Sequence, residues 1–101
     1  MRMLMNITMP HEPFNTAVRN GTVGQIMRKI FGAINPEAVF FTEQNGKRGA
    51  VVIVNVNKAS DIPALAEPWF LNFHADCELR IAMTPEDLQL SGIDEIGKKW
   101  A

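Results

Sequence analysis

A chain of 101 residues fits a single domain over residues 1–101, because two independent hydrophobic cores would need a longer chain. The hydrophobic fraction of 47% is typical of a globular protein. Ten basic and eleven acidic residues give a net charge of -1, and no basic run exceeds two residues. This pattern argues against binding to nucleic acid or to an anionic membrane surface.

Cysteine use and hydropathy bear on the compartment. Cys77 is the only cysteine, so no disulfide can form within the chain, and its apolar neighbours predict a buried structural thiol. The apolar start of the chain is interrupted by Arg2 and Asn6, unlike the unbroken apolar stretch of an export signal. No segment approaches the roughly 18 consecutive apolar residues of a membrane span. We therefore expect a cytoplasmic protein.

The first third of the chain predicts a strand and then a helix. Alternating side chains indicate a strand over Arg2–Thr8, which ends before Pro10 because proline cannot donate a ladder hydrogen bond. Apolar residues at helical spacing then mark a buried stripe: Val23, Ile26, Met27, Ile30, Phe31 and Ile34. Asn20-Gly21 precedes this stripe, so Pro13–Arg19 is expected to form a separate turn or a kinked start.

A hairpin follows the first helix. Asn35-Pro36 ends the helix, and strands are predicted over Ala38–Glu43 and Arg48–Val56. Asn45-Gly46 between them is typical of the tip of a tight hairpin turn.

The second half predicts a helix, a strand and a helical C-terminal segment. Ser60 or Asp61 is expected to cap a helix whose buried stripe is Ile62, Leu65, Ala66, Trp69, Phe70 and Phe73. Pro68 lies inside this helix and removes a hydrogen bond to the Ala64 carbonyl, which predicts a kink or two short helices. A fourth strand is predicted over Cys77–Met83.

The C-terminal segment begins at a strong helix start, Thr84-Pro85-Glu86-Asp87. Ser91-Gly92 is expected to interrupt it, leaving Ile93–Trp100 as a second short helix. The whole order of strands and helices predicts an α+β fold with one antiparallel sheet and helices on one face.

Strand alternation sorts the side chains into two faces. One face is almost wholly apolar and is expected to meet the helices: Met3, Met5, Ile7, Ala38, Phe40, Thr42, Ala50, Val52, Val54, Val56, Cys77, Leu79, Ile81 and Met83. The other mixes apolar and polar residues: Leu4, Asn6, Thr8, Val39, Phe41, Glu43, Val51, Ile53, Asn55, Glu78, Arg80 and Ala82.

The mixed face predicts a homodimer, because a contiguous apolar patch usually marks an interaction site. We expect a second copy of the chain to cover it, through Leu4, Asn6, Val39, Phe41, Glu43, Val51, Ile53, Asn55 and Arg80. Within this interface, Glu43 is expected to pair with the partner's Arg80.

Several motifs between these elements resemble a known family. They are Pro10-His11-Glu12-Pro13-Phe14-Asn15, Phe41-Thr42-Glu43, Gly46-Lys47-Arg48, Asp61-Ile62-Pro63-Ala64-Leu65-Ala66-Glu67-Pro68 and Met83-Thr84-Pro85-Glu86-Asp87-Leu88. Together with the strand order, they resemble the dimeric α/β-barrel superfamily, and more narrowly a small bacterial group of uncharacterised proteins in it. The resemblance spans nearly the whole chain. It implies a ferredoxin-like βαββαβ protomer with a C-terminal helical segment, dimerising into an α/β barrel.

The resemblance implies a range of functions and not one activity. The superfamily includes cofactor-free monooxygenases, haem-degrading enzymes, lactone isomerases and small-molecule binders, with ligand cavities between helices and sheet. The motifs above are turn and packing residues, so no catalytic residue is carried over with them. Fold similarity does not choose among these activities.

Two specific activities have little support in the residues. RNA-recognition modules share this strand order and match Arg48-Gly49, but the stacking aromatics of their third strand are replaced by Ala50 and Val52. Haem-degrading members carry an asparagine, a tryptophan and a histidine. Here Trp69 and His74 are closer together than expected there, and Asn6 is assigned to the face away from the helices.

A ligand site is predicted at His11, Trp69 and His74, each with a structural alternative. His11 either lines a cavity mouth or is a surface loop residue, and His74 suits the C-terminal end of a helix dipole. Trp69 has the spacing of an ordinary core residue. No residues have metal-ligand spacing, so neither a metal nor a cofactor is expected.

The function predicted from the sequence is therefore general. We expect a homodimeric protein that binds a small apolar molecule or serves in assembly alone. The alternative is a cofactor-free enzyme, a monooxygenase or isomerase, acting on a small apolar substrate in a helix–sheet cavity. Glu43, on the mixed face, is a separate candidate general base.

Overall fold

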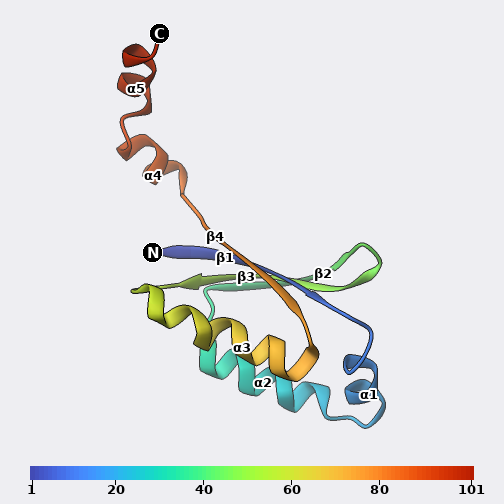
Figure 1. Ribbon diagram of the computed structural model, residues 1–101. Helices are drawn as coiled ribbons and strands as arrows, with labels where there is room; N and C mark the ends of the chain where they lie inside the picture. Colours follow the sequence, from blue (N-terminus) through green and yellow to red (C-terminus); the bar gives the residue numbers. More distant parts are fainter.

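The computed structural model describes residues 1–101 and contains the strands and helices in the predicted order (Figure 1). The strands are β1 (Arg2–Met9), β2 (Ala38–Gln44), β3 (Lys47–Asn55) and β4 (Asp76–Ile81). The helices are α1 (Phe14–Arg19), α2 (Val23–Ile34), α3 (Ile62–Phe73), α4 (Pro85–Leu90) and α5 (Ile93–Lys99), with a short 3-10 helix η1 (Ala59–Asp61) before α3.

The strands form one four-stranded sheet in the order β2-β3-β1-β4, and each neighbouring pair is antiparallel. Figure 1 shows α2 and α3 side by side on one face of this sheet. The predicted α+β class with one antiparallel sheet is confirmed, and α2 and α3 both lie on one face of the sheet. We refer to the other side of the sheet as the open face.

Local sequence signals explain where the elements begin and end. Asn35 ends α2 in a left-handed conformation (φ 45°), and Asn45 and Gly46 both have positive φ at the hairpin tip, as a tight two-residue turn requires. Helix α1 is separate from α2, as Asn20-Gly21 predicted. Thr84 and Asp87 form a reciprocal capping box at the start of α4.

One of the two alternatives predicted for α3 is wrong. Pro68 was predicted to kink this helix or to divide it into two, and α3 is not divided but runs as a single helix from Ile62 to Phe73. The carbonyl that loses its partner belongs to Ala64, which is exposed, so water can replace the missing donor. Asp61 occupies the N-cap position of α3, although its side chain makes no capping hydrogen bond.

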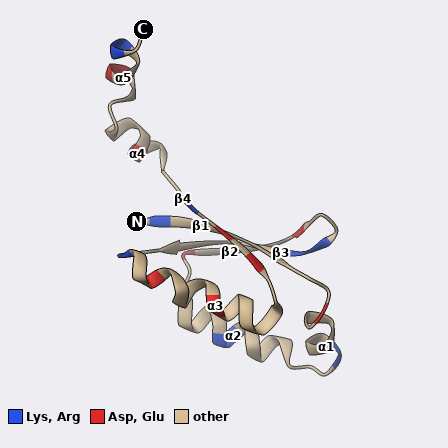
Figure 2. Cartoon of the chain, viewed as in Figure 1, with Lys and Arg blue, Asp and Glu red and all other residues tan.

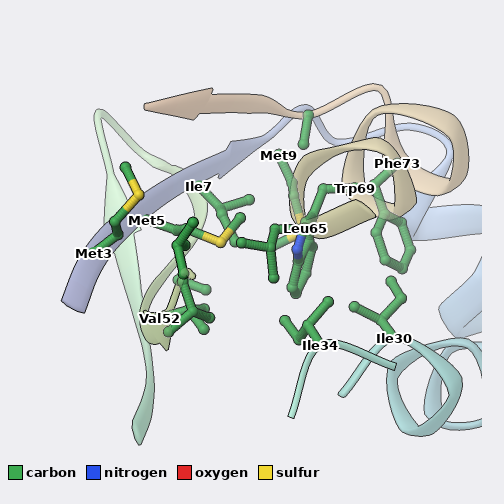
Figure 3. Packing of buried hydrophobic residues seen from close by; sticks show 14 residues of the cluster. Met3, Met5, Ile7, Met9, Ile30, Ile34, Val52, Leu65, Trp69 and Phe73 are labelled. Atoms are coloured by element: carbon green, nitrogen blue, oxygen red, sulfur yellow. The ribbon is translucent and has the colours of Figure 1, made fainter. Parts of the chain in front are cut away.

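The core lies between the sheet and helices α2 and α3. Figure 3 shows the side chains of β1 and β3 pointing towards Trp69 and Phe73 of α3 and towards Ile30 and Ile34 of α2. Trp69 is 0% exposed, and its ring meets Phe31 edge-on at 5.7 Å between centroids. Phe73 packs against Phe14 at 5.0 Å, which fixes α1 to the end of the core. The structural reading of Trp69 is thereby confirmed.

The predicted faces are correct for β1, β3 and β4 but reversed for β2. The register pairs Val39 with Val52 and Phe41 with Ala50, so Val39, Phe41 and Glu43 lie on the helix side of the sheet. Phe41 contacts Phe31 of α2, with ring centroids 6.1 Å apart. Ala38, Phe40 and Thr42 therefore belong to the open face. The two-residue turn sets this register, because it pairs Gln44 with Lys47.

Substitution of Trp69 by alanine tests the core. Trp69→Ala is expected to lower the free energy of unfolding by about 3–5 kcal/mol, because it removes a fully buried aromatic side chain and leaves a cavity. Leu71→Ala on the same helix is the control, since Leu71 is 76% exposed, and its effect should stay within about 0.5 kcal/mol. Chemical denaturation measures both. Equal effects of the two substitutions would contradict the packing described here.

Candidate functional site

The open face carries an apolar patch made by three neighbouring strands. Cross-strand pairs place Ile53 beside Leu4 and Ala38, and Val51 beside Phe40. Phe40 is 64% exposed, and the other members are half-buried. We call Leu4, Ala38, Phe40, Val51 and Ile53 the apolar patch. A large exposed aromatic side chain within such an apolar surface is typical of an interaction site.

A polar cluster borders the apolar patch. The side chain of Gln44 on β2 reaches across β3 to Asn6 and Thr8 on β1. The Thr8 hydroxyl donates to Gln44 Oε1 at 2.7 Å, and Asn6 Nδ2 donates to the same oxygen at 3.1 Å. Gln44 Nε2 donates back to Asn6 Oδ1. The amide groups of Asn6 and Gln44 thus pair with each other in both directions.

Gly49 makes this crossing possible. It lies on β3 directly between the strands that carry Gln44 and Thr8, and it pairs with Thr8. A Cβ atom at Gly49 would stand 2.9 Å from Gln44 Cγ and 3.2 Å from Gln44 Cδ. Any side chain here would displace Gln44, so the absence of a Cβ is what lets the amide lie flat across the sheet.

The charged pair of the open face lies on the edge strand β4. Arg80 Nη2 is 2.7 Å from Glu78 Oε2, and both side chains are exposed. Glu43 lies on the opposite face, where its carboxylate accepts from the Gly46 N–H at 2.9 Å in the hairpin turn. Glu43 and Arg80 therefore share no face, and the expected pairing of Glu43 with the partner's Arg80 loses its geometric basis.

The predicted ligand residues do not converge on a common cavity. Trp69 is buried in the core, where its indole Nε1 has no hydrogen-bond partner. His11 is exposed in the loop after β1, and His74 is exposed at the C-cap of α3 in a left-handed conformation (φ 53°). The structure contains two cavities, and neither is lined by these residues.

The larger cavity is a groove of about 570 Å³ between α2 and α3, on the side away from the sheet. Its apolar lining comes from Ile26, Ile30 and Ala33 of α2 and from Ala64, Pro68 and Leu71 of α3, with Gln25, Lys29, Glu67 and Asn72 as its polar members. This groove was not predicted. Its signal in the sequence is the presence of small residues, Ala33 and Ala64, where longer side chains would fill the space between the helices.

Residues of the recognised motifs make structural contacts. The Arg48 guanidinium stands 4.4 Å from the Phe14 ring centroid and donates to Asn15 Oδ1 at 2.7 Å, which joins the hairpin to α1. Glu12 accepts from the hydroxyl and the backbone N–H of Thr16. The hydroxyl hydrogen bond, the largest cause, lowers the pKa of the Glu12 carboxyl.

The titratable groups form no further site. Burial raises the pKa of the Cys77 thiol to about 11, and the Asp76 carboxylate adds to this shift, so the thiol is protonated at neutral pH. No group of three or more histidine, cysteine, aspartate or glutamate side chains is arranged to hold a metal ion. Figure 2 shows positive and negative residues interspersed over the molecule.

No protein-family model matches the chain, and no curated protein matches it. None of the helices has both the length and the apolar character needed to cross a membrane.

A double-substitution cycle tests the arrangement of Gln44 over Gly49. Gly49→Ala alone is expected to lower the free energy of unfolding by about 1–3 kcal/mol, because the new methyl group overlaps the glutamine side chain. In a Gln44→Ala background the same substitution should be neutral or stabilising by up to about 1 kcal/mol, since alanine is preferred to glycine inside a strand. Urea denaturation of the four proteins measures the cycle. Identical effects of Gly49→Ala in both backgrounds would show that Gln44 does not lie over Gly49.

Proposed function

We propose that this chain functions as a homodimer in which the open faces of two ferredoxin-like protomers pack against each other to form an α/β barrel. The observation that carries the proposal is the apolar patch, with Phe40 64% exposed on the open face. In one copy, α2 and α3 cover only one side of the sheet. A second copy would remove the patch from water.

The chemistry of the open face suits burial. Its amide and hydroxyl groups at Asn6, Thr8 and Gln44 are already hydrogen-bonded to one another, so a partner can cover them without leaving their polar atoms unpaired. The charged groups, Glu78 and Arg80, lie on the edge strand β4, where the rim of an interface keeps contact with water. An apolar patch bordered on one side by a charged edge is compatible with a protein–protein interface.

The groove between α2 and α3 supports a second role, the binding of a small apolar molecule. Its volume of about 570 Å³ lies within the range of small-molecule sites, and Ile26, Ile30 and Leu71 offer apolar contact. Lys29 and Glu67 beside them could orient a polar end of the ligand. Because the groove lies on the side away from the sheet, it would stay open in the proposed dimer. An enzyme remains the alternative, with no residue assigned to catalysis.

Two adjacent phenylalanines provide a matched test of the dimer. Phe40→Ser removes an aromatic ring from the open face and is expected to raise the dimer dissociation constant by roughly 30-fold, equivalent to about 2 kcal/mol. Phe41→Ser is the control, because Phe41 is 62% exposed but lies on the helix side. It should lower stability without changing the dissociation constant by more than about threefold. Sedimentation equilibrium gives both values, and equal weakening by the two substitutions would contradict an open-face dimer.

Binding of an apolar fluorescent probe tests the groove. Anilinonaphthalene sulfonate is expected to bind the folded protein with increased emission, and Leu71→Glu should reduce this signal at least about fivefold by placing a charge in the groove. Val18→Glu on α1 is the control, since Val18 is also an exposed apolar residue but lies outside the groove. An equal loss of signal in both variants would argue against the groove as the binding site.

A further inference from the structure

The C-terminal helices form an arm that stands apart from the rest of the molecule. Figure 1 shows α4 and α5 extending beyond the sheet, and the molecule measures 59 × 28 × 19 Å along its principal axes. We call residues 85–100 the C-terminal arm. Its apolar side chains are exposed to an extent that a soluble surface rarely shows: Leu88 43%, Leu90 85%, Ile93 50%, Ile96 47% and Trp100 79%.

The direction of the arm is set by the residues that connect it to β4. The Ala82 N–H donates to the Arg2 carbonyl at 3.0 Å, so pairing with β1 continues to the residue just before Met83. Thr84 is extended (φ −77°, ψ 165°), the conformation that a following proline favours, and its hydroxyl accepts from the Asp87 N–H. A connection this short and this constrained offers no reverse turn that would fold the arm back over its own sheet.

The arm points to the side of the sheet where the proposed partner would sit. In Figure 1, α4 and α5 lie on the opposite side of the sheet from α2 and α3. This is the side of the open face. A second copy that packs on the apolar patch would therefore stand next to the arm, so the same copy is placed to cover both surfaces.

The arm also has the shape of a contact surface. Ile93, Ile96 and Trp100 are spaced three and four residues apart, so they share one side of the last helical turns. Leu88 and Ile93 line a hollow of about 460 Å³ in the angle between α4 and α5, together with the polar Gln89, Asp94 and Glu95. Trp100 is exposed, and tryptophan is among the residues that most often dominate the binding energy of an interface.

We propose that the C-terminal arm of each protomer clasps the second copy seated on its open face. The inference rests on the proposed dimer and adds a second, separate contact to it. Two-fold symmetry makes the contact reciprocal, so each protomer holds its partner with one arm and is held by the other. In this contact the arms bury apolar side chains that are exposed to water in a single copy, and no further domain is needed to cover them.

Substitutions in the 101-residue chain test whether the arm contributes to the affinity of the dimer. Ile93→Ser with Ile96→Ser removes the apolar side of α5, and the dimer dissociation constant is expected to rise at least tenfold. Lys98→Ser with Lys99→Ser is the control, since it makes the same number of serine substitutions on the same helix at charged residues. This control should change the dissociation constant less than threefold. Equal effects of the two pairs, or no effect of the isoleucine pair, would overturn the proposal.

A mixed-label experiment tests whether the contact is between copies. A nitroxide is attached to a Lys98→Cys chain in which Cys77→Ala has removed the natural thiol, and this chain is mixed with 15N-labelled unmodified protein. Broadening of amide signals from residues 2–81 of the 15N-labelled chain is expected, because it can arise only from the arm of another copy.

The outcomes separate this inference from the proposed function. An open-face dimer that depends on Phe40 but shows no broadening would overturn the arm contact and leave the dimer intact. A chain that remains monomeric at every concentration would overturn both. Broadening together with a tenfold loss of affinity in the isoleucine variant would support both.

Discussion

The structure depends on one constraint: its two central strands carry apolar side chains on both faces. On β3, Ala50, Val52 and Val54 point to the helices and are fully buried, whereas Val51 and Ile53 point the other way. On β1, Met5 and Ile7 face the core and Leu4 faces the other side. Helices α2 and α3 cover only the first set, the side chains that point to the core. The apolar patch of the open face follows from the second set, which one copy of the chain leaves partly exposed.

The polar cluster of the open face limits how this second set can be covered. Gln44 crosses β3 at Gly49 and pairs with Asn6, so the face carries a fixed polar strip beside the apolar patch. A partner that places apolar side chains on Leu4, Phe40 and Ile53 gains more from burial than one that places them on the strip, where the amides already pair with each other. The position of the strip therefore favours alignments in which apolar side chains meet the apolar patch.

Much of the fold could be predicted from short-range signals. The hairpin followed from Asn45-Gly46, the start of α4 from Thr84-Pro85, and the buried stripe of α3 from the spacing of Leu65, Trp69 and Phe73. The faces of β2 could not be read from its composition, because Ala38-Phe40-Thr42 and Val39-Phe41-Glu43 are similarly apolar. Counting back from the two-residue turn would have paired Phe41 with Ala50 and resolved them.

The surface features depend on contacts between distant parts of the chain, so most of them could not be predicted from the sequence. Gln44 and Asn6 are 38 residues apart, and only the strand order brings them together over Gly49. The groove arises from the distance between α2 and α3, and the spacing of apolar residues along each helix contains no information about that distance. The stretch from Thr84 onwards was correctly divided into two helices, but periodicity contains no information about where they lie relative to the sheet.

The central claim is that a second copy covers the open face, and the mass of the unmodified protein in solution tests it most directly. Native mass spectrometry at micromolar concentration is expected to give twice the 11.3 kDa chain mass. Any additional mass on the dimer would identify a bound molecule. A spectrum containing only the single chain, from micromolar concentration up to tens of micromolar, would contradict the claim.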